Sequence, residues 1–116
     1  MSEILSKKNC LSHYKWGENC DGWNFISKLE AVIKQELMPP HTAEKLHFHH
    51  FAEQFFYILK GEATFLIEDK ALTVHENSGL QIKAGLKHKI MNQAVNDLEF
   101  ILFSYPGTEN DRTDCE

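Results

Sequence analysis

Glycine, proline and asparagine divide the chain into short segments rich in β-branched and aromatic residues, and this division is the strongest restriction on its fold. Such segments between turn residues are typical of β-strands. A series of them without a long helical period predicts an all-β antiparallel barrel or sandwich. We expect strands at residues 23–27, 29–38, 46–50, 54–60, 63–67, 71–75, 80–83, 88–92 and 98–105, with a hairpin turn at 68–70.

Residues 29–38 can be interpreted in two ways, because residues 30–37 could also form a helix. The β-branched Val32 and Ile33 and the lack of a convincing N-cap favour a strand. The double proline at 39–40 ends the segment in either case, since neither a helix nor a central strand accepts it.

Two of the expected strands, 54–60 and 98–105, carry apolar side chains on both faces. An antiparallel sheet with one face in water alternates apolar with polar residues instead. The second face must therefore be covered, either by the N-terminal segment or by a partner subunit. We expect a homodimer, and coverage by the N-terminal segment is the equally weighted alternative.

The charge balance argues against a nucleic-acid partner. The chain has 17 acidic and 12 basic residues, a formal net charge of −5, and Arg112 as its single arginine. Nucleic-acid binding favours clustered Arg and Lys, so a small molecule or a second copy of the chain is the expected partner. No apolar run reaches the roughly 20 residues of a membrane helix, and the start lacks the long apolar stretch of a secretory signal. The odd cysteine count predicts free thiols and a cytoplasmic location; the cysteines are Cys10, Cys20 and Cys115.

Seven histidines are present, and four of them lie at residues 41–50. On a strand, the period of two places His47 and His49 on one face, where both could bind one metal ion. The pair alone is a weak signal and favours two surface or core histidines that bind no metal. However, a side chain after the reversal at 50–53 could add an oxygen ligand, and His88 follows the turn glycine Gly85. Three histidines and one oxygen suit Zn, Fe, Mn, Ni or Cu with an open position.

These residues also resemble the two motifs of the cupin family. The first motif is matched by His47-Phe48-His49, four residues, Gln54, six residues and Gly61, and the second by Gly85, His88 and Asn92. The chain is therefore similar to a small single-domain cupin, a conserved barrel protein of the cupin_2 type. The resemblance implies a cupin-type antiparallel β-sandwich or barrel (a double-stranded β-helix, jelly-roll-like) at residues 23–105. Residues 1–22 would be an N-terminal extension and residues 106–116 a loose polar C-terminal tail.

The resemblance implies four metal ligands, which are His47, His49, Gln54 and His88. Gln54 stands where the family usually has Glu, so either its neutral amide binds the metal or a bulge brings Glu53 inward. The spacing to Gly61 favours Gln54. A neutral ligand set would favour Zn, Ni or Cu over Mn, and an anionic substrate or hydroxide at the open position. The family's glycine before the second motif is replaced by Asn77, which tolerates a left-handed turn.

The expected function is a metal-binding cupin that acts on a small organic molecule in the barrel mouth, as a dioxygenase or isomerase. The alternative is a non-catalytic small-ligand-binding module, with or without metal. Glu53 and His50 are the candidate catalytic groups, and the substrate is not specified by the sequence. Some apolar side chains could line a substrate pocket, although residues at strand spacing more often form plain core; these are Phe56, Ile58, Phe65, Phe100 and Leu102.

Overall fold

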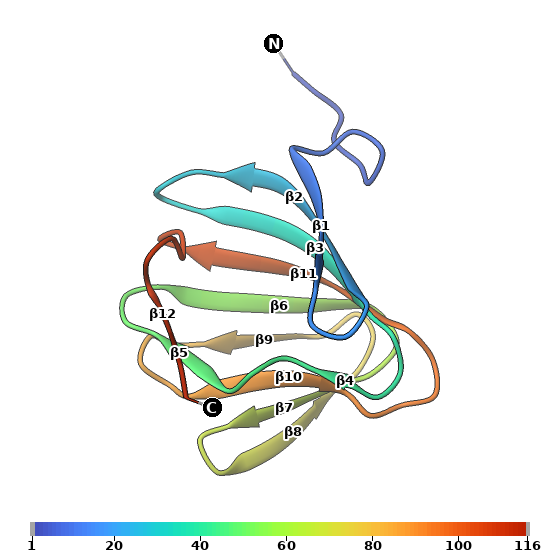
Figure 1. Ribbon diagram of the computed structural model, residues 1–116, viewed down its shortest axis with the longest axis vertical. Helices are drawn as coiled ribbons and strands as arrows, with labels where there is room; N and C mark the ends of the chain where they lie inside the picture. The colour runs from blue at the N-terminus through green and yellow to red at the C-terminus, as the bar shows by residue number, and fades with distance from the viewer. Residues whose placement is uncertain (1, 116) are drawn as a thin grey trace.

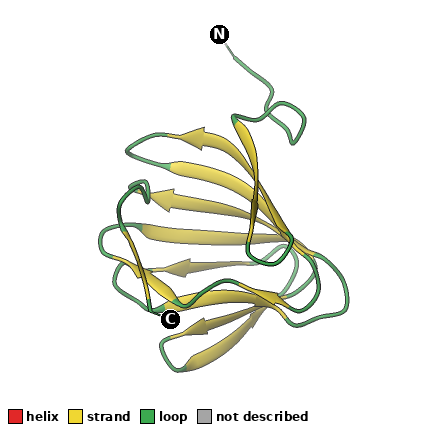
Figure 2. Ribbon diagram, in the orientation of Figure 1, coloured by secondary structure: helices red, strands yellow, loops and turns green. Residues whose placement is uncertain are grey.

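The computed structural model describes residues 2–115, and this part of the chain contains strands and loops without a helix (Figure 2). All nine expected strands are present, which confirms the all-β class. In chain order the strands are β1 Ser12–Trp16, β2 Cys20–Ser27, β3 Val32–Met38, β4 Thr42–Ala43, β5 His47–His49, β6 Glu53–Lys60, β7 Ala63–Ile67, β8 Lys70–Val74, β9 Gly79–Ile82, β10 His88–Asn92, β11 Leu98–Tyr105 and β12 Arg112–Asp114.

The strands form two antiparallel sheets that enclose the interior (Figure 1). One sheet has the order β1-β2-β3-β11-β6-β9, and the other has the order β12-β5-β10-β7-β8, with β4 paired to β10. Neighbours such as β3 and β11 are distant in sequence, as expected for a double-stranded β-helix. Within residues 2–115 no helix is long and apolar enough to span a membrane.

Residues 32–38 form a strand because they are paired on both sides. Residues 32–38 align with residues 98–104 of β11, and residues 32–37 align with residues 21–27 of β2. A helix in this position would leave two ladders without partners, so tertiary pairing decides against the helical alternative.

The expected loose tail after Tyr105 instead forms part of the barrel wall. Its strand β12 pairs with β5, so that Arg112 lies opposite His49 and Asp114 opposite His47. Just before β12, the buried Asp111 carboxylate accepts hydrogen bonds from the backbone N–H groups of residues 50–52 at 2.9–3.2 Å. The expected N-terminal extension likewise supplies β1, which pairs with β2. Residues 1 and 116, the outer ends of the two expected segments, lie outside the described residues.

Two turn positions use a left-handed backbone. Asn77, which replaces the family's glycine, has φ 63°, so the expected turn is kept without glycine. Gly61 has φ 88°, and a Cβ there would lie 2.5 Å from the carbonyl oxygen of Asp97. Gly61 is therefore required by both conformation and space.

The outer face of β6 and β11 leaves several apolar side chains partly exposed. Leu59, Phe103 and Tyr105 have exposed fractions of 41%, 36% and 39%. The N-terminal segment reaches this sheet through Lys7, which forms an ion pair with Glu99 at 2.9 Å and lies over the ring of Trp23. The segment then projects away from the barrel (Figure 1). All three cysteines are free thiols, as expected.

Candidate metal centre

Three imidazoles meet inside the barrel. Strand β5 directs His47 and His49 inward, and His88 begins β10 directly opposite His47. Their exposed fractions are 2%, 4% and 2%, and one ring nitrogen from each lies within 4.8 Å of the others. The ring centroids of His47 and His88 are 4.4 Å apart. His47 and His88, which are 41 positions apart, thus belong to one cluster because β5 and β10 are paired.

Backbone carbonyls set which imidazole nitrogens carry the protons. Nδ1 of His47 lies 2.7 Å from the carbonyl oxygen of Lys45, and Nδ1 of His88 lies 2.9 Å from that of Leu86. A carbonyl only accepts hydrogen bonds, so both Nδ1 atoms must donate. The Nε2 lone pairs of both rings are then available to a metal ion. In metal sites the hydrogen bond at the other ring nitrogen fixes the tautomer of the histidine ligand in this way.

The fourth inward side chain next to the imidazoles is Gln54, whereas Glu53 lies on the other face of β6. The amide of Gln54 donates from Nε2 to the Ser104 hydroxyl at 3.0 Å, and its Oε1 lies 3.1 Å from Nε2 of His88. Glu53 accepts a hydrogen bond from Gln81 at 3.0 Å on the outer face. No bulge brings Glu53 inward, because β6 keeps an unbroken register with β9 from Gln54 onward.

This cluster has more lone pairs than protons. His88 Nε2 and Gln54 Oε1 are both acceptors when His88 donates from Nδ1, and neither nitrogen of the buried His49 has a hydrogen-bond partner within residues 2–115. Buried acceptors without donors cost about 1–3 kcal/mol each. A shared cation satisfies one lone pair each from His49, His88 and Gln54, whereas the protonated nitrogen of His49 still lacks a partner within residues 2–115. Reversing the Gln54 amide, with the Ser104 hydroxyl as donor, relieves only the contact with His88. The donor set therefore fits a metal ion.

Burial keeps the imidazoles neutral. It lowers the pKa of His47 to about 3 and that of His49 to about 4, with smaller contributions from neighbouring histidines and Arg112. It also lowers the pKa of His88. A neutral imidazole is the form that binds metal, so the cluster is ready for a cation across the physiological pH range.

A cavity of about 250 Å³ lies beside the cluster. Most of its wall was not identified from the sequence as functional, notably Tyr14 on β1, Glu36 on β3 and Arg112 on β12. The residues around it are Tyr14, Trp16, Lys34, Glu36, Glu44, His47, His49, Gln54, Phe56, Leu102, Thr108 and Arg112. The available sequence signals were the charged Glu36 at an inward position of β3 and the fact that Arg112 is the only arginine.

Two carboxyl groups of this wall, the buried Glu36 and the half-buried Glu44, have raised pKa values. Burial, with a smaller contribution from the nearby Glu36, raises the pKa of Glu44 to about 8. Burial also raises the pKa of Glu36, which accepts a hydrogen bond from the Tyr14 hydroxyl. Burial raises the pKa of Tyr14 as well, so this hydroxyl stays protonated. The cavity therefore contains carboxyl groups able to carry a proton at neutral pH.

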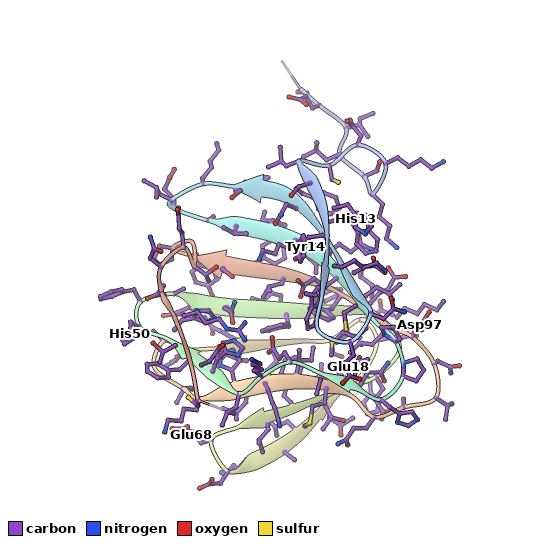
Figure 3. All side chains as sticks on the ribbon, viewed as in Figure 1. His13, Tyr14, Glu18, His50, Glu68 and Asp97 are labelled. Atoms are coloured by element: carbon purple, nitrogen blue, oxygen red, sulfur yellow. The ribbon has the colours of Figure 1, made fainter. Side chains whose placement is uncertain are left out.

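The other candidates lie elsewhere. His50 lies at the periphery of the molecule, where its Nε2 is 3.0 Å from the Thr113 hydroxyl (Figure 3). Neither His50 nor Glu53 borders the cavity. Of the five expected apolar lining residues, Phe56 and Leu102 border it, whereas three belong only to the packed core; these are Ile58, Phe65 and Phe100.

The fold and the site together define a class of protein. It is a small two-sheet β-barrel in which paired strands direct imidazoles inward to a candidate metal site. The chain belongs to the cupin family, because the model of the Cupin domain matches residues 34–104. This confirms the resemblance inferred from the motifs.

Several known proteins are similar to the chain. An uncharacterized protein from Methanocaldococcus jannaschii is 23% identical over 91 residues, which cover 78% of this chain and 73% of that protein. A predicted oxalate decarboxylase from Thermotoga maritima has a TM-score of 0.79 and 20% identity, with 90% of this chain and 99% of that chain covered. The polyketide cyclase RemF from Streptomyces resistomycificus has a TM-score of 0.81 and 14% identity, with 100% and 87% covered. At these identities the solved structures establish the fold alone.

Proposed function

We propose that this cupin binds one divalent transition metal ion through His47, His49, His88 and Gln54 and acts on a small organic molecule in the adjoining cavity. The observation that carries the proposal is a group of buried polar atoms without matching partners, namely the His49 ring, neither of whose nitrogens has a partner among residues 2–115, and the facing acceptors His88 Nε2 and Gln54 Oε1. Four neutral ligands favour Zn, Ni or Cu over Mn, although Fe also accepts such donors.

When bound, such a metal supplies a Lewis acid, and a redox centre if it is Fe, Cu, Ni or Mn rather than Zn. The chain's own contribution is to hold the substrate and exchange protons. Glu36 and Glu44 border the cavity with raised pKa values, and Tyr14 donates to Glu36. Groups that exchange a proton near neutral pH suit an isomerase more directly than a dioxygenase. Glu36 and Glu44 replace Glu53 and His50 as the proposed catalytic groups.

The metal content of protein purified without chelators tests this proposal. We expect one ion per chain by elemental analysis, and its loss in His47→Ala and His88→Ala. The exposed His75 lies outside the cluster, so His75→Ala is the matched control. Failure of the wild-type chain to retain Zn²⁺, Ni²⁺ or Cu²⁺ after direct titration contradicts the proposal.

A non-catalytic binding module is the second candidate function, and the small cavity supports it, because about 250 Å³ holds a ligand without requiring turnover. Glu36→Gln separates the two candidates. A binding module keeps its ligand affinity and has no turnover to lose, whereas an enzyme keeps binding and loses turnover. Free thiols are also consistent with our proposal of a cytoplasmic location.

We also propose a homodimer formed through the outer face of β6 and β11. Its support is the partly exposed apolar surface around Leu59, Phe103 and Tyr105. Light scattering should give twice the 13.4 kDa chain mass. Phe103→Glu should return the particle to the monomer mass, and a monomeric wild-type chain at micromolar concentration refutes the dimer.

A further inference from the structure

The only arginine of the chain borders the cavity and has an incompletely used guanidinium group. Arg112 lies on β12 opposite His49 in the register. Its Nε donates to the Asp114 carboxylate at 2.7 Å, and this is the one hydrogen bond of the guanidinium to another of residues 2–115. A guanidinium carries five N–H donors in a planar fork, so most of its donors remain available to a ligand.

The charges around the cavity favour an anion. Lys34 also borders it, with Nζ 5.5 Å from the centre of the Tyr14 ring. The two carboxyl groups do not cancel these cations fully, because burial shifts Glu36 and Glu44 toward their protonated forms. The cationic side chains that line the cavity are Lys34 and Arg112, and Arg112 also pairs with Asp114.

The cavity has room for a small ligand. A volume of about 250 Å³ corresponds to roughly eight water molecules at about 30 Å³ each. This space accommodates a molecule of roughly ten non-hydrogen atoms. The lining includes apolar surface from Phe56 and Leu102 as well as polar groups, so an organic skeleton is accommodated alongside a charged group.

We propose that the cavity binds a small organic carboxylate whose carboxylate group pairs with Arg112 while the rest of the molecule extends toward the imidazole cluster. A carboxylate matches the guanidinium fork and can accept two parallel hydrogen bonds from it. The inference deepens the proposed function by naming its substrate class. The contact with Arg112 itself does not require the metal.

Calorimetric titration of the full chain, with and without Zn²⁺, tests the proposal with four probes: oxalate, malonate, succinate and benzoate. Succinamide is the uncharged match for succinate. We expect at least one carboxylate to bind and succinamide to bind at least tenfold more weakly. Arg112→Gln should weaken carboxylate binding by about tenfold to a hundredfold, because a charge-assisted pair is lost. Arg112→Lys, which keeps the charge and loses the fork, should lie between wild type and Arg112→Gln.

Lys70→Gln is the charge-matched control, because Lys70 is exposed on the β7–β8 hairpin away from the cavity lining. It should leave carboxylate binding unchanged. Thermal melting and Zn²⁺ titration of each variant separate misfolding and metal loss from a specific effect on the anion.

The proposal is overturned if none of the four carboxylates binds at millimolar concentration, if succinamide matches succinate, or if Arg112→Gln behaves like Lys70→Gln. Preferential binding of 1,4-diaminobutane would also overturn it, since a cation is favoured only if Glu36 and Glu44 are ionised. Arg112-dependent carboxylate binding by a chain that takes up no Zn²⁺ would support this inference and contradict the metal proposal, so the two failures are distinguishable.

Discussion

The two halves of the barrel interior are built from the same strands but filled differently. Along β6 the inward residues run from Gln54 through Phe56 to Ile58, and along β10 they run from His88 to Ile90. We call one end the packed half; it contains Met38, Ile58, Phe65, Leu98 and Phe100. The other end, the imidazole half, contains Glu36, His47, His49, Gln54 and His88.

The packed half is filled by side chains that need no polar partner, such as Phe65 and Phe100, both fully buried. The imidazole half is equally protected from water but leaves His49 without a hydrogen-bond partner within residues 2–115. Apolar burial stabilises the fold, whereas buried polar atoms without partners destabilise it. The comparison indicates that stability comes mainly from one half and chemistry from the other.

The largest expected effect is on stability, from the packed half. Phe100→Ala removes a fully buried ring that contacts Phe56 at a centroid distance of 5.5 Å. We expect unfolding free energy to fall by about 3–5 kcal/mol. The milder Phe100→Leu should lower the unfolding free energy by less, and this variant should remain folded. Denaturant titration of both variants measures the two losses. Metal affinity of Phe100→Leu should stay at the wild-type value, and a parallel loss would show that the halves are not separable.

The next effect is the pH dependence of metal affinity. Three imidazoles with the ordinary pKa of about 6.5 would lose roughly five-hundred-fold in affinity between pH 7 and pH 5.5, because protons compete with the metal. Burial lowers the pKa of His47 to about 3 and of His49 to about 4, so protons compete much less. We expect Ni²⁺ affinity to change by less than about tenfold over this range, measured by competition with a chelator. A steep loss would indicate water in the imidazole half.

A substitution in the imidazole half should stabilise the metal-free chain and at the same time abolish metal binding. His49→Leu replaces a side chain with two unpartnered buried nitrogens by an apolar one. The metal-free chain should gain up to about 1–3 kcal/mol in unfolding free energy. The same change should abolish stoichiometric Ni²⁺ binding, and His75→Leu serves as the exposed control. If His49→Leu destabilises the metal-free chain, the cost assigned to those nitrogens is wrong.

The smallest effect concerns the charge of the fourth ligand. Gln54→Glu adds a carboxylate beside His88 and within reach of the Ser104 hydroxyl. A charged ligand binds a divalent ion more strongly than an amide, so Mn²⁺ affinity should rise by roughly tenfold, with a smaller rise for Ni²⁺. Equal affinities of the two proteins for Mn²⁺ would argue that residue 54 does not contact the ion.

The sequence predicted the parts of the site that depend on local spacing. The alternation on β5 placed His47 and His49 on one face, and the spacing to Gly61 indicated Gln54 rather than Glu53 as the inward residue. The strand period and the turn residues were sufficient for these inferences.

The parts that the sequence did not predict depend on long-range pairing. Strand β12 has three exposed residues and no apolar alternation, so nothing local indicates that Arg112 lies beside His49. Similarly, Tyr14 and Glu36 are 22 residues apart in the chain. They meet only because β1, β2 and β3 are neighbours in one sheet. Local propensity carries no information about such contacts.

The Asp111 carboxylate joins the C-terminal segment to the loop that follows the histidine strand, through the N–H groups of residues 50–52. Truncating the chain before Asp111 would delete Arg112 from the cavity wall. It would also remove β12 and leave β5 as an unprotected edge strand. Fusion partners added at the carboxyl end would be attached only a few residues from the entrance. Protein engineering of this chain is therefore safer at the amino end, which projects from the barrel (Figure 1).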